Sequence, residues 1–379
     1  MQSDALQAAA SRLKATDTIV THRDGSRTLE RQGNQVGTLP PPDVLPPALQ
    51  ERKRMCIAPP EPPSWTLPPF ATFQLPPPAG ASLRVVTWNV WFGPVEAQAR
   101  MAALFSEALG TTPDVICLQE VVPDLAASIR GCSALRRAYA ISANDVGSYG
   151  CLILARHELS PRFTEVPYQC SRMGRSLLVA ELSPPADPAP PAACRVAVAT
   201  THLESLNNAR LRAKQLRIAR DTLASYDSAA LVGDFNFDSS QNFGDWLPRG
   251  DRRTMPPRPE RESSDSDSEP RPPWAPPSAL RRAELENGVL DLVMGDYIDA
   301  WPALRPHEAG HTFDGGSNPH VADVEERMRY DRVMVRGIAP AAITMLGERP
   351  QEALVPSDHY SACSCLRNRC LEIGCWKFG

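Results

Sequence analysis

Between residues 83 and 366 the chain alternates short apolar runs with longer stretches of helical periodicity. Short runs rich in valine, leucine and alanine are typical of buried strands. They predict strands over residues 83–88, 114–118, 150–155, 162–166, 176–181, 195–200, 229–232, 330–336 and 361–365. Apolar positions that recur every three or four residues predict helices over residues 95–109, 123–130 and 209–223.

The order of these elements predicts the fold class. Strands alternate with helices in parts of the region, whereas four strand candidates follow one another between residues 150 and 200. Strands separated by helices pair in parallel, and consecutive strands pair antiparallel. We therefore predict an α/β (α+β) domain with two packed sheets that are mixed and largely antiparallel.

Prolines mark the expected domain boundaries, because 27 of the 39 lie within residues 40–78, 184–191 and 256–277. Residues 1–80 are expected to be a proline-rich, largely disordered N-terminal extension, with a weak hairpin signal over residues 18–32. Residues 81–366 would form the main folded domain, interrupted by a disordered insertion over residues 249–284 that carries an acidic serine run. A short cysteine-containing tail, residues 367–379, would follow.

Charge and cysteine usage restrict the class of protein. The formal net charge of −4 gives no overall basic footprint, so nucleic-acid binding has to be argued from a site. Several of the ten cysteines lie in apolar runs, as Cys117 does, and no apolar stretch is of signal-peptide or membrane-spanning type. The late cysteines lack paired zinc-ligand spacing. We expect an intracellular protein of the nucleus, the cytoplasm or both, which is neither secreted nor membrane-bound.

Polar side chains follow several of the predicted strands at the point where each strand ends. Asn89, Glu120, His202 and Asp234 each close an apolar run, and His359 precedes the last strand. Taken singly, each of these is more typical of a turn, a cap or a solvated loop. Together they indicate a site, because strand ends gather where ligands bind.

These residue types suit the hydrolysis of a phosphate ester. Such a reaction needs a cation on a phosphate oxygen, an activated water and a stabilised leaving oxyanion. Glu120 is a suitable ligand for Mg²⁺, which prefers oxygen ligands and keeps several waters. Asp234 would orient or deprotonate the water, while Asn89 and Asn236 hold the water and the phosphate in line.

Further residues are candidates for charge stabilisation and substrate contact. His202 and His359 would donate to phosphate oxygens, and Asp331 would favour the imidazolium form of a histidine. Arg175 is either a solvated residue at the start of a strand or a bidentate contact to phosphate. Trp301 would stack on a base or, as is more usual for tryptophan, pack in the core.

Six short motifs in one order resemble the endonuclease/exonuclease/phosphatase superfamily. They are Thr-Trp-Asn (87–89), Leu-Gln-Glu-Val (118–121), Thr-His-Leu-Glu-Ser (201–205), Gly-Asp-Phe-Asn (233–236), Tyr-Asp-Arg-Val (330–333) and Ser-Asp-His (357–359). The resemblance implies a four-layer α/β sandwich with helices outside both sheets. It also implies a metal-dependent phosphoesterase that uses Mg²⁺, with Mn²⁺ as a substitute.

Within that superfamily the chain is most similar to the tyrosyl-DNA phosphodiesterase 2 family. Further matches are Pro-Asp-Val-Ile (113–116), Met-Gly-Arg (173–175), Asp-Ala-Trp (299–301) and His-Thr-Phe-Asp (311–314). The resemblance implies a monomer that removes a topoisomerase tyrosine stub from 5′-tyrosyl DNA ends. The implied catalytic set is Asn89, Glu120, Asp234 and His359, with Asp358 and Asp331 supporting the metal and His359.

The chain departs from this family in some places. The insertion over residues 249–284 is longer than usual, and Phe313 stands where the family tends to carry a tryptophan that contacts DNA. Two alternatives therefore stay open. One is another phosphoesterase of the same fold, acting on abasic DNA, RNA tails, or lipid or inositol phosphates. The other is a non-catalytic binding protein that keeps the fold.

The insertion provides the first test. Deletion of residues 256–277 should leave turnover within about twofold of the full chain, because a proline-rich acidic segment contributes little to a packed core. Turnover of the two proteins on one phosphodiester substrate measures this. A large loss would mean that the segment shapes the active site.

Overall fold

The computed structural model describes residues 17–21, 27–31, 34–39, 82–183, 195–238, 290–348 and 354–367. The chain divides into two units, Met1–Pro63 and Ser64–Gly379. In the first unit an antiparallel sheet contains β1 (Asp17–Thr21), β2 (Arg27–Arg31) and β3 (Asn34–Leu39). The hairpin expected within residues 18–32 is therefore confirmed, and it gains a third strand.

The second unit contains two six-stranded sheets, of which the first is built around β4 and β5. Its strand order is β16 (Ala339–Leu346), β17 (Ser361–Arg367), β4 (Ser82–Asn89), β5 (Val115–Val121), β7 (Gly150–Arg156) and β6 (Tyr139–Ile141). Only β4 and β5 pair in parallel, and the other neighbours are antiparallel.

The second sheet repeats this plan around β10 and β11. Its order is β12 (Ile298–Asp299), β15 (Asp331–Arg336), β11 (Ser228–Asp234), β10 (Val196–His202), β9 (Ser176–Leu182) and β8 (Arg162–Pro167). The parallel pair is β10 with β11, and the other neighbours are antiparallel. The predicted pair of mixed, largely antiparallel sheets is confirmed.

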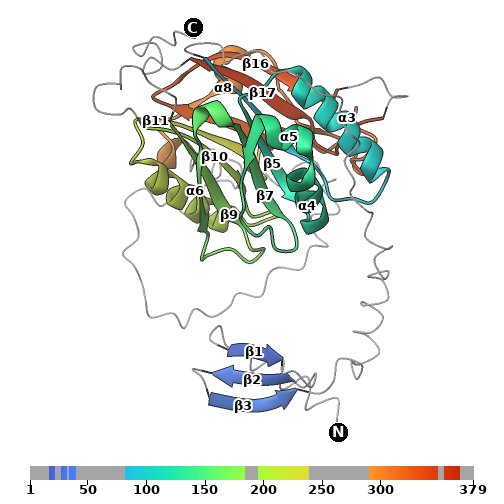
Figure 1. Ribbon diagram of the computed structural model, residues 1–379, viewed down its shortest axis with the longest axis vertical. Coiled ribbons are helices and arrows are strands. Elements are labelled where there is room, and N and C mark those ends of the chain that lie inside the picture. The colour runs from blue at the N-terminus through green and yellow to red at the C-terminus, as the bar shows by residue number, and fades with distance from the viewer. Residues whose placement is uncertain are drawn as a thin grey trace. The chain divides into compact units, whose positions relative to one another are not determined.

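Helices cover the outer face of each sheet, which gives four layers (Figure 1). The first sheet carries α3 (Ala97–Gly110), α4 (Pro123–Gly131) and α5 (Ser133–Ala138). The second carries α6 (Ala209–Leu223) and a helical turn over residues 290–293. Between the sheets lies a core that both supply, from Val85 and Ile153 on one side to Val198 and Val333 on the other. Each large apolar side chain buried in this way stabilises the fold by about 1.5–3 kcal/mol.

Some elements were not predicted, because each is very short or lacks the regular alternation of a strand. The edge strand β16 buries only Ile343, contains a proline and has a bulge after Pro340. The strands β13 (Phe313–Asp314) and β14 (Arg327–Met328) and the helix α8 (Ala300–Leu304) are very short. The 3₁₀ turn η1 (His157–Leu159) and the short β6 and α5 were also missed. Tertiary packing stabilises such segments more than their own propensity does.

Several expectations fall outside the described residues. They concern the insertion over residues 249–284, the tail after residue 367, the remaining parts of residues 1–80, and Cys370 and Cys375. Cys363 and Cys365 lie in β17, and they are free, as are the other described cysteines. No described helix has the length and apolar character needed to cross a bilayer.

The strand directions bring the predicted site residues to one edge of the two sheets. Asn89 ends β4 and Glu120 lies in the last residues of β5, while His202 and Asp234 end β10 and β11 and are paired across that parallel ladder. The antiparallel neighbour β15 begins at the same edge, where Asp331 is paired with Asp234. The carboxyl ends of both parallel pairs therefore meet the starts of β15 and β17.

Gly233 allows β11 to pass closely beside β10, which positions Asp234. Its φ is +132°, and a Cβ atom there would lie 2.1 Å from the carbonyl oxygen of Thr201. Gly233→Ala should therefore lower the free energy of unfolding by roughly 2–4 kcal/mol, as expected for a clash with backbone at a strained φ. Urea denaturation measures this. The matched control is Gly110→Ala, where a Cβ would meet nothing within 4 Å and stability should be kept.

Candidate active site

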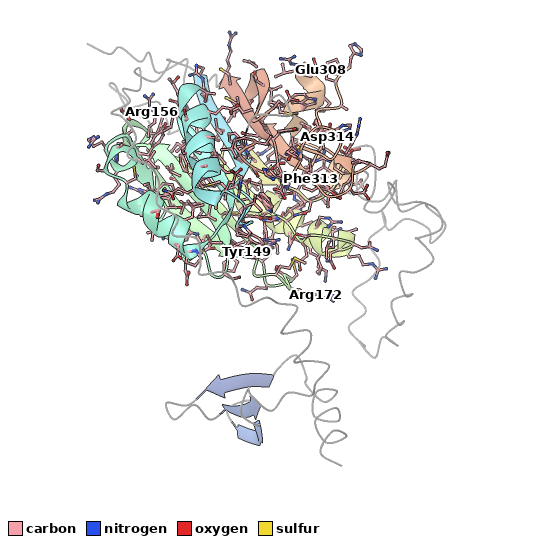
Figure 2. The ribbon with its side chains drawn as sticks, turned by 90° about the vertical axis from the view of Figure 1, so that its right-hand side faces the viewer. Tyr149, Arg156, Arg172, Glu308, Phe313 and Asp314 are labelled. Atoms are coloured by element: carbon pink, nitrogen blue, oxygen red, sulfur yellow. The ribbon has the colours of Figure 1, made fainter. Side chains whose placement is uncertain are left out.

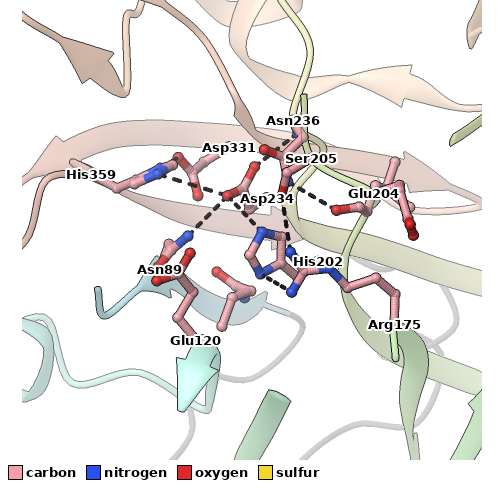
Figure 3. A network of polar contacts seen from close by, with 12 residues as sticks. Asn89, Glu120, Arg175, His202, Glu204, Ser205, Asp234, Asn236, Asp331 and His359 are labelled. Carbon is pink, nitrogen blue, oxygen red and sulfur yellow. Dashed lines mark hydrogen bonds and ion pairs between the residues drawn. The ribbon is translucent and has the colours of Figure 1, made fainter. Parts of the chain in front are cut away.

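The carboxylate of Asp234 lies at the centre of a buried polar network (Figure 3). It accepts hydrogen bonds from Asn89 Nδ2 at 2.9 Å and from the backbone N–H of Asn236 at 2.8 Å. His202 Nε2 and His359 Nε2 lie 3.4 Å and 3.8 Å from Asp234 Oδ2, the oxygen that Asn89 also contacts. Burial alone would raise the pKa of Asp234, but the two imidazoles and the hydrogen bonds outweigh burial and lower that pKa. Asp234 is therefore an ionised group at neutral pH.

His202 is held as a neutral imidazole. Arg175 Nη1 lies 3.0 Å from its Nδ1, so that the guanidinium donates to this nitrogen and the proton is left on Nε2, facing Asp234. Burial, together with the positive charge of Arg175, lowers the pKa of His202 to about 3. Arg175 also donates to Ser205 Oγ at 3.0 Å.

His359 has the opposite electrostatic character. Its Nδ1 lies 2.8 Å from Asp331 Oδ2, and its backbone carbonyl accepts a hydrogen bond from Trp88 Nε1 at 3.0 Å. Burial disfavours the cation, but the charges of Asp331 and Asp234 outweigh burial and raise the pKa of His359 well above its usual value. The site therefore pairs one neutral and one cationic imidazole.

Glu120 points into the site from an irregular part of β5. The register between β5 and β7 shifts between Leu118 and Val121, and Glu120 has φ +60°. A non-glycine residue in this region costs roughly 1–3 kcal/mol, and such strain is concentrated at functional sites. The Phe92 N–H faces Glu120 Oε2 at 3.4 Å. Without the bulge, the alternation of the strand would direct this carboxylate differently.

Asp358 is a second carboxylate beside Glu120. Burial raises its pKa to about 7, with Glu120 and Asp234 adding to the rise and His359 opposing it. Ser357 Oγ donates to the carbonyl oxygen of Asn89 at 2.6 Å, which joins this segment to the end of β4. The Ser357–His359 segment is thus connected directly to β4.

The carboxylates fit a magnesium ion. Burial and the neighbouring charge of Asp234 raise the pKa of Glu120, so an added cation would relieve a local excess of negative charge. The described part of the chain holds no group of three or more histidine, cysteine, aspartate or glutamate side chains arranged around a metal position. Mg²⁺ does not need one, because it binds through one or two carboxylates and keeps its waters. Glu120, with Asp358 beside it, would hold the ion.

Aromatic side chains border the network on two sides. Tyr149 lies under the Arg175 guanidinium at 4.9 Å from its ring centre, and Phe92 is 5.0 Å from Tyr149. On the other side, the edge of Phe313 contacts the His359 ring at a centroid distance of 5.0 Å. Figure 2 shows Tyr149 and Phe313 at separate positions on the second unit. Trp301 is not brought to the network: it packs in the core between the sheets and donates to Glu308 O at 2.9 Å.

The other predicted site residues are brought together, and the structure adds residues that sequence reasoning missed. Asn236 Nδ2 bonds the Leu203 carbonyl at 2.9 Å. Buried Glu204 accepts a hydrogen bond from Ser171 Oγ at 2.7 Å. Ser171 Oγ in turn accepts one from the backbone N–H of Arg175 at 2.9 Å. Glu204 stands in the Thr-His-Leu-Glu-Ser motif and could have been suspected. Ser171 and Tyr149 lie in irregular segments and gave no signal.

With fold and geometry established, comparison with known proteins identifies the class. Residues 86–359 match the Endonuclease/Exonuclease/phosphatase family, and the chain belongs to that family. Membership supports a phosphoester hydrolase. A search of the curated proteins found no match.

Solved structures of tyrosyl-DNA phosphodiesterase 2 (TDP2) share the fold. D. rerio TDP2 complexed with single-strand DNA product is 22% identical, covers 75% of this chain and 98% of its own, and has a TM-score of 0.54. Truncated Caenorhabditis elegans TDP2 is 21% identical, covers 76% and 97%, and also has a TM-score of 0.54. At these identities the likeness concerns the fold.

The His359–Asp331 pair provides a test of the electrostatics. A raised folded pKa stabilises the protein below the unfolded value, near 6.5, and this stabilisation is lost as the pH rises through the folded pKa. Asp331→Asn removes the nearest negative charge while burial stays, so the pKa of His359 should fall. NMR titration of the His359 ring carbons measures this. An unchanged titration would mean that Asp331 does not set the charge of His359.

Proposed function

We propose that this protein is a magnesium-dependent phosphodiesterase that hydrolyses 5′-phosphotyrosyl DNA ends, of the kind left by a trapped topoisomerase. The observation that carries the proposal is the network around Asp234, in which an ionised carboxylate lies between two amide groups, one neutral imidazole and one cationic imidazole. Among the residues that the structure describes, the contacts of this carboxylate come from asparagine and histidine, not from a serine, cysteine or threonine side chain. Hydrolysis by an activated water accounts for such a set better than a covalent nucleophile does.

Asp234 would accept the proton of the attacking water. Its lowered pKa keeps it ionised, and Asn89 Nδ2 fixes its orientation. Asn236, held by the carbonyl of Leu203, would help to align the water. Fixed alignment of this kind supplies much of the rate enhancement of a hydrolase.

Positive charge on the other side of Asp234 would stabilise the transition state. His359 is a cation supported by Asp331, and it can donate from Nε2 to a phosphoryl oxygen. Arg175 would add a second positive charge on the phosphate side, and its buried Nε has no hydrogen-bond partner among the described residues. Mg²⁺ bound at Glu120 would supply a further cation that polarises a phosphate oxygen.

The choice of a phosphotyrosyl ester has two supports. A phenol has a pKa near 10, so a phenolate leaves with little protonation and the reaction depends little on a general acid. The DNA-bound D. rerio TDP2 has the same fold as this chain. We infer DNA ends as the binding partner of a monomeric repair hydrolase of the nucleus or cytoplasm. Enzymes of this family generally use divalent metals, which supports Mg²⁺ or Mn²⁺ as the cofactor.

The test compares purified wild-type protein with Glu120→Gln on a 5′-tyrosyl oligonucleotide, with Mg²⁺ and with EDTA. Glu120→Gln should lower kcat by at least about a hundredfold, because the carboxylate that holds the cation is lost. The matched control is Glu158→Gln, an exposed change in η1, which should retain full activity. EDTA should abolish turnover, and Mg²⁺ or Mn²⁺ should restore it.

Abasic DNA, poly(A) and an inositol phosphate are assayed beside the tyrosyl substrate. A preference for one of these three would overturn the tyrosyl assignment while the phosphoesterase class survives. Equal activity of Glu120→Gln and the wild type would overturn the proposed metal site. Absence of turnover on all four substrates would favour a binding protein that keeps the fold.

A further inference from the structure

Two buried arginines occupy equivalent places in the two halves of the second unit. Arg100 is the fourth residue of α3, and Arg212 is the fourth residue of α6. Each helix connects the two parallel strands of its own sheet, β4 with β5 and β10 with β11. Each follows a strand that ends in a site residue, Asn89 or His202. Exposure of both arginines is 1% or less, whereas arginine side chains are mostly exposed in proteins.

Arg100 uses its guanidinium to bind carbonyl oxygens only. Nε donates to Val95 O at 2.7 Å, Nη1 to Val90 O at 3.3 Å and Pro356 O at 2.9 Å, and Nη2 to Trp91 O at 3.2 Å and Gly93 O at 2.6 Å. A guanidinium has five N–H donors in a fixed fork, and here each has an acceptor. Four of the carbonyls belong to the segment after β4, and the fifth belongs to the segment before β17.

These contacts control the orientation of candidate site residues. The Trp91 N–H donates to Asn89 Oδ1 at 3.1 Å, so the amide that faces Asp234 is oriented from the clamped segment. Trp91 itself has φ +52° and stacks on the Arg100 guanidinium at 4.4 Å from its ring centre. Pro356 immediately precedes the segment that carries Asp358 and His359. Arg100 therefore ties Asn89 to His359.

Arg212 does the same for the other half of the site. Its Nη1 donates to Glu204 O at 2.6 Å and to Leu206 O at 2.7 Å, and Leu206 again has a positive φ, +62°. The Glu204 carboxylate accepts a hydrogen bond from Ser171 Oγ, and Ser171 Oγ accepts one from the backbone N–H of Arg175. Ser205, between the two clamped carbonyls, accepts from Arg175 Nη2. The basic helix 209–223 is thus not only a solvated face, because Arg212 points inward.

We propose that Arg100 and Arg212 are paired positioning residues, one for each half of the site. Arg100 sets the groups that act on the water and the leaving oxygen, and Arg212 sets the Arg175 contact to the substrate phosphate. Their kinetic consequences rest on the proposed function, whereas their structural consequences do not. Left-handed backbone is unfavourable in a non-glycine residue, and the carbonyl contacts of the two arginines offset this cost at Trp91 and Leu206.

The test uses Arg100→Lys and Arg212→Lys, which keep the charge but lose the fork. Arg156→Lys is the matched control. Arg156 is also buried, but it pairs with Asp114 at 3.1 Å at the opposite end of β5, and Figure 2 shows it well away from Tyr149 and Phe313. All three variants are measured for melting temperature, kcat and KM on the tyrosyl oligonucleotide.

Arg100→Lys should lower kcat by about tenfold or more with KM within about twofold, since a misplacement of 1 Å in a site costs up to a hundredfold. Arg212→Lys should raise KM by about fivefold or more with a smaller change in kcat, because it loosens a ground-state contact. Arg156→Lys should lower the melting temperature without changing either constant. The proposal would be overturned if Arg100→Lys and Arg212→Lys also lowered the melting temperature without changing kcat or KM.

Hydrogen exchange provides a readout that does not need activity. Arg100→Lys should speed exchange in residues 90–95 and 356–359 but not in 203–206, and Arg212→Lys should do the converse. Exchange rates in the variants equal to those of the wild type in all three segments would contradict the clamps. This holds even if the protein proves not to be a phosphodiesterase. If a lysine variant does not fold, the wild-type protein is used: separate Nη resonances of Arg100 in nitrogen-15 NMR support the clamp, and a single averaged resonance overturns it.

Discussion

The burial of one negative charge organises the described part of the second unit. A carboxylate removed from water loses a large hydration energy, so Asp234 requires hydrogen-bond donors and positive charge around it. Asn89 and the Asn236 backbone supply hydrogen bonds, both histidines turn a ring nitrogen toward the carboxylate, and His359 alone brings positive charge. These partners come from four separate places in the chain. Any rearrangement of the strand ends would leave the charge uncompensated.

The rest of the site consists of supports for these partners. Asp331 keeps His359 charged, Arg175 keeps His202 neutral, and the two histidines therefore contribute differently to the same oxygen. The backbone is strained near this point at Glu120 and Asn236, which have positive φ angles without being glycine. Strain of this kind persists only where the surroundings fix the conformation, and buried hydrogen bonds to the backbone provide that fixation here.

The two sheets follow the same plan, and this repetition explains how so many groups meet at one edge. Each sheet has one parallel pair joined by a helix, and the carboxyl ends of both pairs point the same way. Gln119 joins the sheets at this edge, because its Nε2 lies 2.8 Å from Thr200 Oγ1 and 3.1 Å from Thr87 Oγ1. Such a polar tie specifies how the sheets pack more narrowly than apolar contacts do.

The sequence by itself determined the buried strands, the long helices and the group of strand-end residues, because apolar periodicity and motif order are local properties that do not depend on folding. Tertiary structure alone decided the edge strand β16, the placement of Trp301 in the core, the neutral state of His202 beside the cationic His359, and the inward direction of Arg100 and Arg212. Each of these depends on partners distant in sequence. An arginine on a helix looks solvated until the carbonyls that surround it are known.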